Sequence, residues 1–182
     1  MLVGIIRTER LDLWSMTPQF LDASLQSNVT PEVRFSVPGE WFAERALMEM
    51  RLNDLETKPS AQPWLLRAIV ERDSQQMVGH IGFHTPPDPP YLQSICPGAV
   101  EFGYTVYSAY RRRGFAYEAS LGMMDWAHQR HGIVDFIASA DPDNIPSVNL
   151  LAKLGFEKIG GHMDEVDGYE DIFRRQCSRL TP

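Results

Sequence analysis

The stretch that decides the fold begins with Glu-Phe-Gly-Tyr-Thr-Val at residues 101–106 and continues to Arg111-Arg112-Arg113-Gly114-Phe115-Ala116. The first run contains β-branched and aromatic residues and predicts a strand. The second is a basic turn that precedes a stretch typical of a helix. Such a turn is a ready anion site, because the first N–H groups of a helix lack partners and lie at the positive end of its dipole. Small residues let a phosphate approach the backbone, so we expect a phosphorylated ligand here.

A second strand and a second helix follow downstream. Residues 135–140 predict a strand, and a helix opens at Asn144-Ile145-Pro146-Ser147 and closes at Leu154-Gly155-Phe156. Asp143 or Asn144 is expected to cap this helix, because a short polar side chain can accept a bond from an N–H of the first turn. Strands that alternate with helices in this way predict a mixed α/β sheet.

The rest of the chain extends this pattern on both sides. We expect strands at Arg10–Trp14, Trp64–Glu71 and Gln76–Thr85, helices at Thr17–Leu25 and Trp41–Leu55, a loop at Pro86–Pro97, and a final hairpin around Asp167-Gly168. The helix predicted at Trp41–Leu55 is expected to place Phe42, Ala46, Met50 and Leu55 on one side.

Composition excludes several classes of protein. The 182 residues fit a single domain, 1–182, with one core. A net charge of −7 argues against nucleic acid as a partner, since nucleic-acid-binding proteins usually carry a basic face. No apolar run approaches the ~18 residues that span a bilayer, and the charged N-terminal region does not suit a signal peptide. We therefore expect a cytoplasmic protein with no membrane partner.

The spacing of cysteines and histidines predicts no metal site. Cys96 and Cys177 are far apart in the sequence and form neither a metal-binding pattern nor a disulfide framework. His80 and His84 are four residues apart, but they lie on a predicted strand with no third ligand nearby.

Three motifs in order resemble the GNAT superfamily of acyl-CoA-dependent N-acetyltransferases. Arg111-x-x-Gly114-x-Ala116 is similar to the family's pyrophosphate loop. Asn144-x-x-Ser147 resembles the start of its second cofactor-contacting helix, and Leu154-Gly155-Phe156 resembles the end of that helix. The run Thr8-Glu9-Arg10-Leu11-Asp12-Leu13 resembles the opening strand of the branch that includes the ribosomal-protein alanine N-acetyltransferases.

This resemblance implies a fold and a co-substrate. The fold would be a mixed, mostly antiparallel central sheet of about seven strands with about four flanking helices. The sheet would splay where the strand at residues 102–106 leaves the strand at residues 135–140, and the pantetheine arm of acetyl-CoA would enter that gap. A homodimer is a further expectation from the family.

Specific positions would contact acetyl-CoA. The pyrophosphate would be surrounded by the backbone N–H groups of Arg112, Arg113, Gly114, Phe115 and Ala116, and arginine side chains, Arg111 among them, would add charge-assisted bonds. The thioester carbonyl would lie near the N–H of Val106 or Tyr107. The Asn144 amide would bond the pantetheine arm, and Ser147 would lie near the leaving thiolate.

Glu101 is the leading base for amine acetylation, acting through water. The alternative is a glutamate at a strand edge that faces solvent or pairs with an arginine. In many relatives a tyrosine that would serve as the general acid stands seven residues after the asparagine that corresponds to Asn144. This sequence has Leu151 at that position. The proton for the leaving thiolate would then come from Ser147, from water or from Tyr107, or proximity alone would suffice.

We therefore expect an acetyl-CoA-dependent N-acetyltransferase that acts by direct attack of a primary amine on the thioester. The acceptor would be a protein N-terminus or a small amine. One alternative is a non-catalytic acyl-CoA-binding module, because the family tyrosine is missing. Another is an interaction protein that keeps only the fold.

Overall fold

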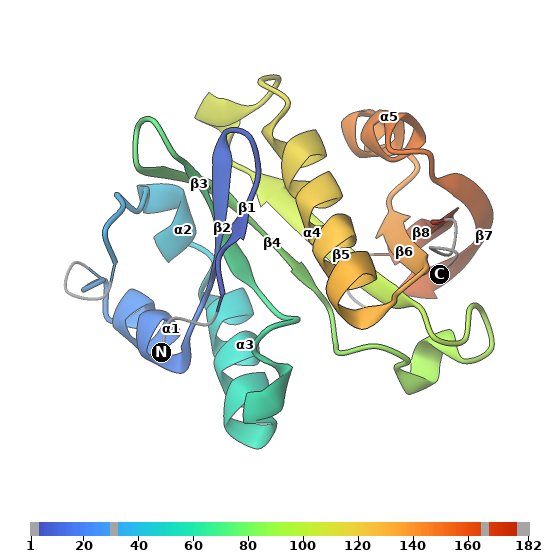
Figure 1. The fold of residues 1–182 in the computed structure, drawn as a ribbon, viewed down its shortest axis with the longest axis horizontal. Helices are drawn as coiled ribbons and strands as arrows, with labels where there is room; N and C mark the ends of the chain where they lie inside the picture. Colours follow the sequence, from blue (N-terminus) through green and yellow to red (C-terminus); the bar gives the residue numbers. More distant parts are fainter. Residues whose placement is uncertain (1–3, 30–32, 165–167, 178–182) are drawn as a thin grey trace. The chain divides into compact units, whose positions relative to one another are not determined.

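The computed structural model describes residues 4–29, 33–164 and 168–177, and Figure 1 shows their secondary structure. These residues form eight strands and five α-helices, with three short 3-10 turns. The strands are β1 (Ile6–Arg7), β2 (Leu11–Ser15), β3 (Arg67–Glu71), β4 (Gln76–Phe83), β5 (Val100–Val106), β6 (Asp135–Ala140), β7 (Glu157–Asp164) and β8 (Gly168–Gln176). The helices are α1 (Pro18–Leu25), α2 (Gly39–Phe42), α3 (Arg45–Thr57), α4 (Phe115–His131) and α5 (Ile145–Lys153).

The strands follow the hydrogen-bonded order β1-β2-β3-β4-β5-β6-β8-β7. β5 and β6 pair in parallel, and β1–β2, β2–β3, β3–β4, β6–β8 and β7–β8 pair antiparallel. The mixed, mostly antiparallel sheet is thus confirmed. The strand beyond the expected seven is the two-residue β1, and the helix beyond the expected four is α2.

The chain divides into two compact units. The first contains residues 1–82 and 104–122, and the second contains residues 83–103 and 123–182. The expectation of a single acetyltransferase domain over 1–182 stays a prediction.

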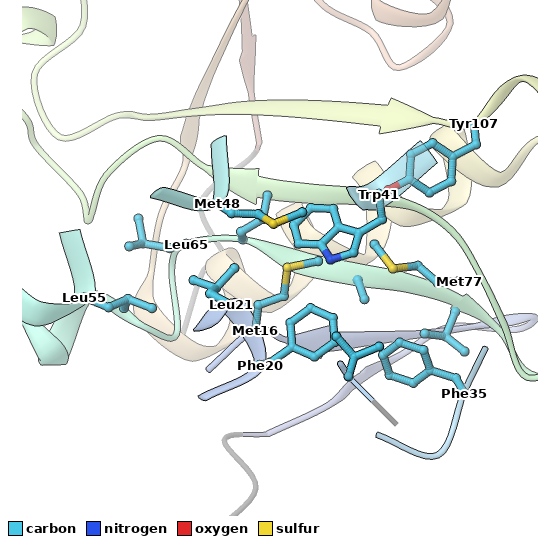
Figure 2. Packing of buried hydrophobic residues seen from close by; sticks show 14 of the residues in the cluster. Met16, Phe20, Leu21, Phe35, Trp41, Met48, Leu55, Leu65, Met77 and Tyr107 are labelled. Carbon is cyan, nitrogen blue, oxygen red and sulfur yellow. The ribbon is translucent and has the colours of Figure 1, made fainter. Parts of the chain in front are cut away.

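The first unit has an apolar core beneath β2 to β4. Figure 2 shows Trp41, which is fully buried, with Phe20 and the side chains of Met16, Met48 and Met77 around it. The rings of Trp41 and Phe20 stack with centroids 6.0 Å apart. The indole N–H of Trp41 donates to Ser24 Oγ at 2.9 Å, which satisfies its polar atom inside the core.

The predicted helix at Trp41–Leu55 is wrong in one respect, because the chain forms two helices there. The N–H groups of Ala43 and Glu44 bond carbonyls three residues back, which closes α2 before α3 begins. Burial of Trp41 fixes α2, and α3 starts again with a different face inward. That face carries Met48, Arg51 and Leu55, whereas Met50 is 48% exposed.

The helix ends follow the predicted signals. Thr17 caps α1, with its Oγ1 accepting the Phe20 N–H at 3.1 Å and Pro18 in the first turn. Asn144 caps α5, and Gly155 follows that helix with a φ of +80°, where a residue without a side chain is unstrained. Both predicted caps are confirmed.

In the second unit the parallel pairing of β5 with β6 is short. Val100 pairs with Phe136 and Glu101 with Ile137, but the pairing stops there although β6 continues to Ala140. The predicted splay requires such an end to the pairing at residue 102. β7 and β8 form the predicted final hairpin, and the tip at residues 165–167 lies outside the described residues.

Candidate active site

The first unit presents a turn of unpaired backbone donors at the start of α4. Among the residues that the structure describes, the N–H groups of residues 112–116 have no acceptor, whereas the next ordered bond runs from Glu118 N to Gly114 O at 3.1 Å. Arg112 and Gly114 both have positive φ, at 64° and 81°. Alternation of this kind turns successive N–H groups toward one concave point and suits an anion. The backbone of this turn therefore suits an anion, and the anion site itself stays a prediction.

The three arginines of this turn are not equivalent. Arg111 Nε donates to the Val106 carbonyl at 2.9 Å, so its side chain ties the turn to the end of β5. The Arg113 guanidinium lies 5.7 Å from the Phe115 ring centroid and 3.9 Å from Glu71. The Arg112 side chain is exposed and has no partner among the described residues. Arg112 is therefore the arginine most available to a phosphate.

A brace from residues 8–10, which connect β1 and β2, holds this turn, and it was not predicted from the sequence. The Glu118 carboxylate accepts from Thr8 Oγ1 at 2.6 Å and from both the backbone N and Nε of Arg10 at 2.7 Å. Arg10 Nη1 also donates to the Arg113 carbonyl at 3.0 Å, and its guanidinium lies 4.9 Å from the Phe115 ring centroid. Thr8 and Arg10 belong to the run that resembles the family's opening strand, and that run was the available signal.

The same contacts change the pKa of the Glu118 carboxyl group. Burial alone would raise the pKa of Glu118, but the bonds from Thr8 and Arg10 outweigh burial and leave that pKa below its ordinary value. The carboxylate is therefore ionised near neutral pH, and it stays a strong acceptor for Arg10.

At the end of β5 only one of the two predicted oxyanion donors remains. The Tyr107 N–H donates to the Val78 carbonyl at 3.0 Å and is already used. Because successive N–H groups along a strand point to opposite edges, the Val106 N–H points away from β4. Val106 therefore stays a candidate, and the Tyr107 N–H does not.

The Tyr107 side chain lies inside the apolar core of the first unit. It is 3% exposed, and its hydroxyl has no hydrogen-bond partner among the described residues. Its ring lies beside His80, whose Nε2 is 3.6 Å from Glu44 Oε1. Burial, together with the negative charges of Glu44 and Glu40, raises the pKa of Tyr107 far above its ordinary value.

In the second unit Glu101 is buried and held by polar neighbours. It is 7% exposed, and its Oε1 accepts from Ser139 Oγ at 2.7 Å. His84 Nδ1 lies 3.5 Å from Oε2, and Tyr91 also bonds the carboxyl group. Burial would raise the pKa of Glu101, but these partners outweigh it, with His84 first, and leave the pKa lowered. The alternative of a solvent-facing or arginine-paired glutamate is therefore wrong.

The start of α5 carries the other predicted contacts. Asn144 Oδ1 accepts the Ser147 N–H at 3.3 Å, while the Asn144 amide nitrogen is exposed and has no partner among the described residues. Ser147 is half-buried one turn into the helix. Leu151 is 1% exposed, packed at the position where the family tyrosine would stand.

The described residues lack two further kinds of feature. Within residues 4–29, 33–164 and 168–177, histidine, cysteine and acidic side chains form no group suited to a metal ion. In the same ranges no helix has the length and apolar character that crossing a membrane requires.

Comparison with known proteins decides the family. A family model described as an acetyltransferase (GNAT) domain matches residues 10–157. The chain belongs to the GNAT acetyltransferase family. Among its relatives is the uncharacterized N-acetyltransferase YjdG of Bacillus subtilis (strain 168), 29% identical over 160 residues that cover 84% of this chain and 89% of the relative. Another is the uncharacterized N-acetyltransferase p20 of Bacillus licheniformis, 27% identical over 84% of this chain and 82% of the relative.

Solved GNAT structures share the fold. The ribosomal-protein-S5-alanine acetyltransferase of Vibrio fischeri has a TM-score of 0.65 at 15% identity, with 98% of this chain and 100% of that chain covered. The ribosomal L7/L12 alpha-N-protein acetyltransferase RimL in complex with coenzyme A has a TM-score of 0.65 at 14% identity, covering 95% of this chain and 98% of that chain. The expected GNAT fold is thus confirmed, and the family assignment makes this chain an acetyltransferase rather than a protein that keeps only the fold.

Proposed function

We propose that this acetyltransferase moves the acetyl group of acetyl-CoA to a primary amine. The observation that carries the proposal is the run of backbone N–H groups at residues 112–116, which lack acceptors among the described residues. A run of N–H groups at a helix N-terminus suits a pyrophosphate, and coenzyme A carries one. The exposed Arg112 guanidinium would add a charge-assisted bond, and the Asn144 amide nitrogen would donate to the pantetheine arm.

The reaction is a direct transfer. The amine nitrogen attacks the thioester carbonyl carbon, the C–S bond breaks, and one proton leaves the nitrogen. The Val106 N–H, which points away from β4, would stabilise the oxyanion. The Glu101 carboxylate, ionised because its pKa is lowered, would support removal of the proton.

Two groups were expected as proton donors to the thiolate. Ser147 is half-buried at the start of α5, and we keep it as the candidate together with water. The raised pKa of Tyr107 and its apolar surroundings oppose release of a proton, so we assign it no proton transfer.

For the acceptor, we propose a protein N-terminus first and a small amine second. Two structures of the same fold are titled as acetyltransferases of ribosomal proteins. An α-amino group, with an ordinary pKa of about 7.7–8.0, is partly neutral near pH 7 and needs little help from a base. The net charge of −7 would also attract a cationic acceptor.

Cofactor binding is tested by Gly114→Glu and thermal unfolding. Acetyl-CoA should raise the melting temperature of the wild-type protein, and Gly114→Glu should remove that shift by placing a carboxylate at the anion site. Gly132→Glu is the matched control, because Gly132 also has positive φ, at 71°, at the far end of α4 with open space around it. Absence of any shift at millimolar acetyl-CoA in the wild type would overturn the cofactor assignment.

Catalysis is tested by thiol release with N-terminal peptides, polyamines, amino acids and aminoglycosides as acceptors. Amine-dependent release, with an acetylated product confirmed by mass, is the expected result. Binding of acetyl-CoA with no release above background for any acceptor class would favour the non-catalytic binding module instead.

A further inference from the structure

His84 lies directly beside the buried carboxylate of Glu101. It follows β4 by one residue, and its backbone N–H donates to the Glu101 carbonyl at 2.8 Å, which fixes the two residues side by side. Its ring Nδ1 is 3.5 Å from Glu101 Oε2. The His84 side chain is 44% exposed, whereas that of Glu101 is 9% exposed. An acceptor amine arriving from solvent therefore reaches the imidazole more readily than the carboxylate.

The carboxylate itself is held in place from three elements. Ser139 on β6 donates to Oε1 at 2.7 Å, His84 faces Oε2, and Tyr91 from the 3-10 turn Pro90–Leu92 bonds the same group. A carboxylate with this many partners is fixed in one orientation. It is also a weak proton acceptor, since its pKa is lowered.

Gly103 makes room for the other nitrogen of the ring. A Cβ built at Gly103 would lie 3.0 Å from His84 Nε2, so any larger residue would press on the imidazole. Gly103 stands two residues after Glu101 on β5, on the same face of the strand. The ring therefore has Nδ1 toward the carboxylate and Nε2 beside Gly103.

We propose that His84 takes the proton from the acceptor amine through Nε2, and that Glu101 is a positioning residue that orients the ring through Nδ1. This inference rests on the proposed function. The nitrogen–carbon bond forms, the C–S bond breaks, the amine proton passes to Nε2 and coenzyme A leaves as the thiolate. The imidazolium then returns the proton to water at its exposed side.

The chemistry favours imidazole in this role. Histidine is the side chain whose charge ordinarily changes near neutral pH, and a base is most effective when its pKa lies near the working pH. A buried carboxylate at Nδ1 fixes the tautomer and the orientation of the ring, as in other histidine–carboxylate pairs. Within this unit the Glu101 carboxylate faces the His84 ring, and Tyr91 contacts the same carboxyl group.

The test compares pH profiles of kcat/KM for one peptide amine in the wild type and in His84→Gln, His84→Ala and Glu101→Gln. The acceptor amine titrates in the same way in the assays of all four proteins, so a difference between their pH profiles comes from the enzyme. His84→Gln should lower kcat/KM at least ~100-fold near neutral pH and remove the acidic limb that belongs to the enzyme. Exogenous imidazole should partly rescue His84→Ala. Glu101→Gln should keep that limb but lower kcat/KM, because the ring loses the group that orients it.

His162→Gln is the matched control. His162 lies in the same unit, its side chain is 42% exposed, and its Nε2 is 4.0 Å from Glu170, so it is a histidine–glutamate pair outside the proposed site. Its kcat/KM should match the wild type. Thermal unfolding and acetyl-CoA affinity of each variant establish that the fold and cofactor binding persist, and His84→Asn repeats the test if His84→Gln is unstable.

The outcomes separate the two proposals. If Glu101→Gln abolishes the limb while His84→Gln only shifts it, Glu101 is the base and the role given to His84 is overturned. An unchanged profile in His84→Gln overturns it as well. If the wild type itself transfers no acetyl group to any amine, the proposed function fails, and this inference fails with it.

Discussion

Arg10 and Glu118 stand 108 positions apart in the sequence and are bonded twice, through the backbone N and Nε of Arg10 at 2.7 Å each. The same guanidinium donates to the Arg113 carbonyl at 3.0 Å. The opening strands of the chain therefore hold the start of α4, and with it the row of N–H groups proposed to bind pyrophosphate. A binding loop that is ordered before the ligand arrives loses less entropy on binding.

Arg10→Ala should therefore weaken acetyl-CoA binding without removing any atom of the anion site. We expect about a tenfold rise in Kd, which corresponds to ~1.4 kcal/mol, and a loss of about 1.5–3 kcal/mol in the free energy of unfolding. Calorimetry and urea unfolding measure the two effects. Arg7→Ala is the control for binding, because Arg7 is an exposed arginine that pairs with the buried Asp12 and not with Glu118 or Arg113. Equal Kd values for Arg10→Ala and Arg7→Ala would show that the brace does not act on the site.

The brace also predicts a pH dependence for stability. The pKa of Glu118 is lowered in the folded protein, so its contribution is fully present above its unfolded pKa and is lost as pH falls through the folded value. The difference in unfolding free energy between wild type and Glu118→Gln should be constant above about pH 5, where a free glutamate is ionised, and shrink toward acid pH. Glu49→Gln, in an exposed pair with Arg45, is the control and should show no such trend. A difference that grows toward acid pH would contradict this assignment.

The sequence predicts the local features well because their causes are local. Thr17 and Pro18 start α1, Asn144 starts α5, and Gly155 follows α5 with positive φ, each through bonds or backbone angles within a few residues. The strand at residues 135–140 has the predicted ends, because its short apolar run at residues 136–138 lies between turn-forming polar segments.

What the sequence could not predict depends on distant contacts. The break between α2 and α3 follows from the burial of Trp41 among side chains of several other elements. The surroundings of Glu101 come from His84, Tyr91 and Ser139, which are separated along the chain and meet only in the folded unit. The link between Arg10 and Glu118 is of the same kind. The residue types at the positions that make these distant contacts form no periodic pattern from which the contacts could be predicted.

Loss of the Arg112 side chain should affect acetyl-CoA binding but not stability, unlike loss of a neighbouring arginine side chain that is bonded within the protein. Its side chain is exposed without a partner among the described residues, so Arg112→Gln should leave the melting temperature unchanged. It should nevertheless raise the Kd for acetyl-CoA about tenfold, since a charge-assisted phosphate bond contributes about 1.5–3 kcal/mol. The effect should diminish as salt rises, because exposed charges are screened. Arg111→Gln should instead also lower stability, because it removes the bond to the Val106 carbonyl. A stability loss in Arg112→Gln equal to that in Arg111→Gln would contradict the distinction.

Asn144 has two proposed roles, and the substitution Asn144→Asp tests them separately. Its Oδ1 caps α5 by accepting the Ser147 N–H, and its amide nitrogen is the proposed donor to pantetheine. Asn144→Asp keeps the cap acceptor and loses the donor, so stability should persist while KM for acetyl-CoA rises. Asn144→Ala loses both and should also cost about 0.5–2 kcal/mol of stability. If Asn144→Asp leaves KM unchanged, the contact with pantetheine is excluded.

Tyr107→Phe tests whether the buried hydroxyl takes part in the reaction. The hydroxyl has no partner among the described residues and lies within the apolar core beside Trp41, as Figure 2 shows. A buried, unsatisfied polar group costs about 1–3 kcal/mol, so its removal should leave the protein equally stable or more stable. Because the raised pKa of Tyr107 opposes release of its proton to the thiolate, kcat with a saturating amine should also persist. Tyr110→Phe, at a partly buried tyrosine beside the same cluster, is the control for loss of a hydroxyl. A large fall in kcat for Tyr107→Phe alone, with acetyl-CoA affinity intact, would instead make Tyr107 the proton donor to the thiolate.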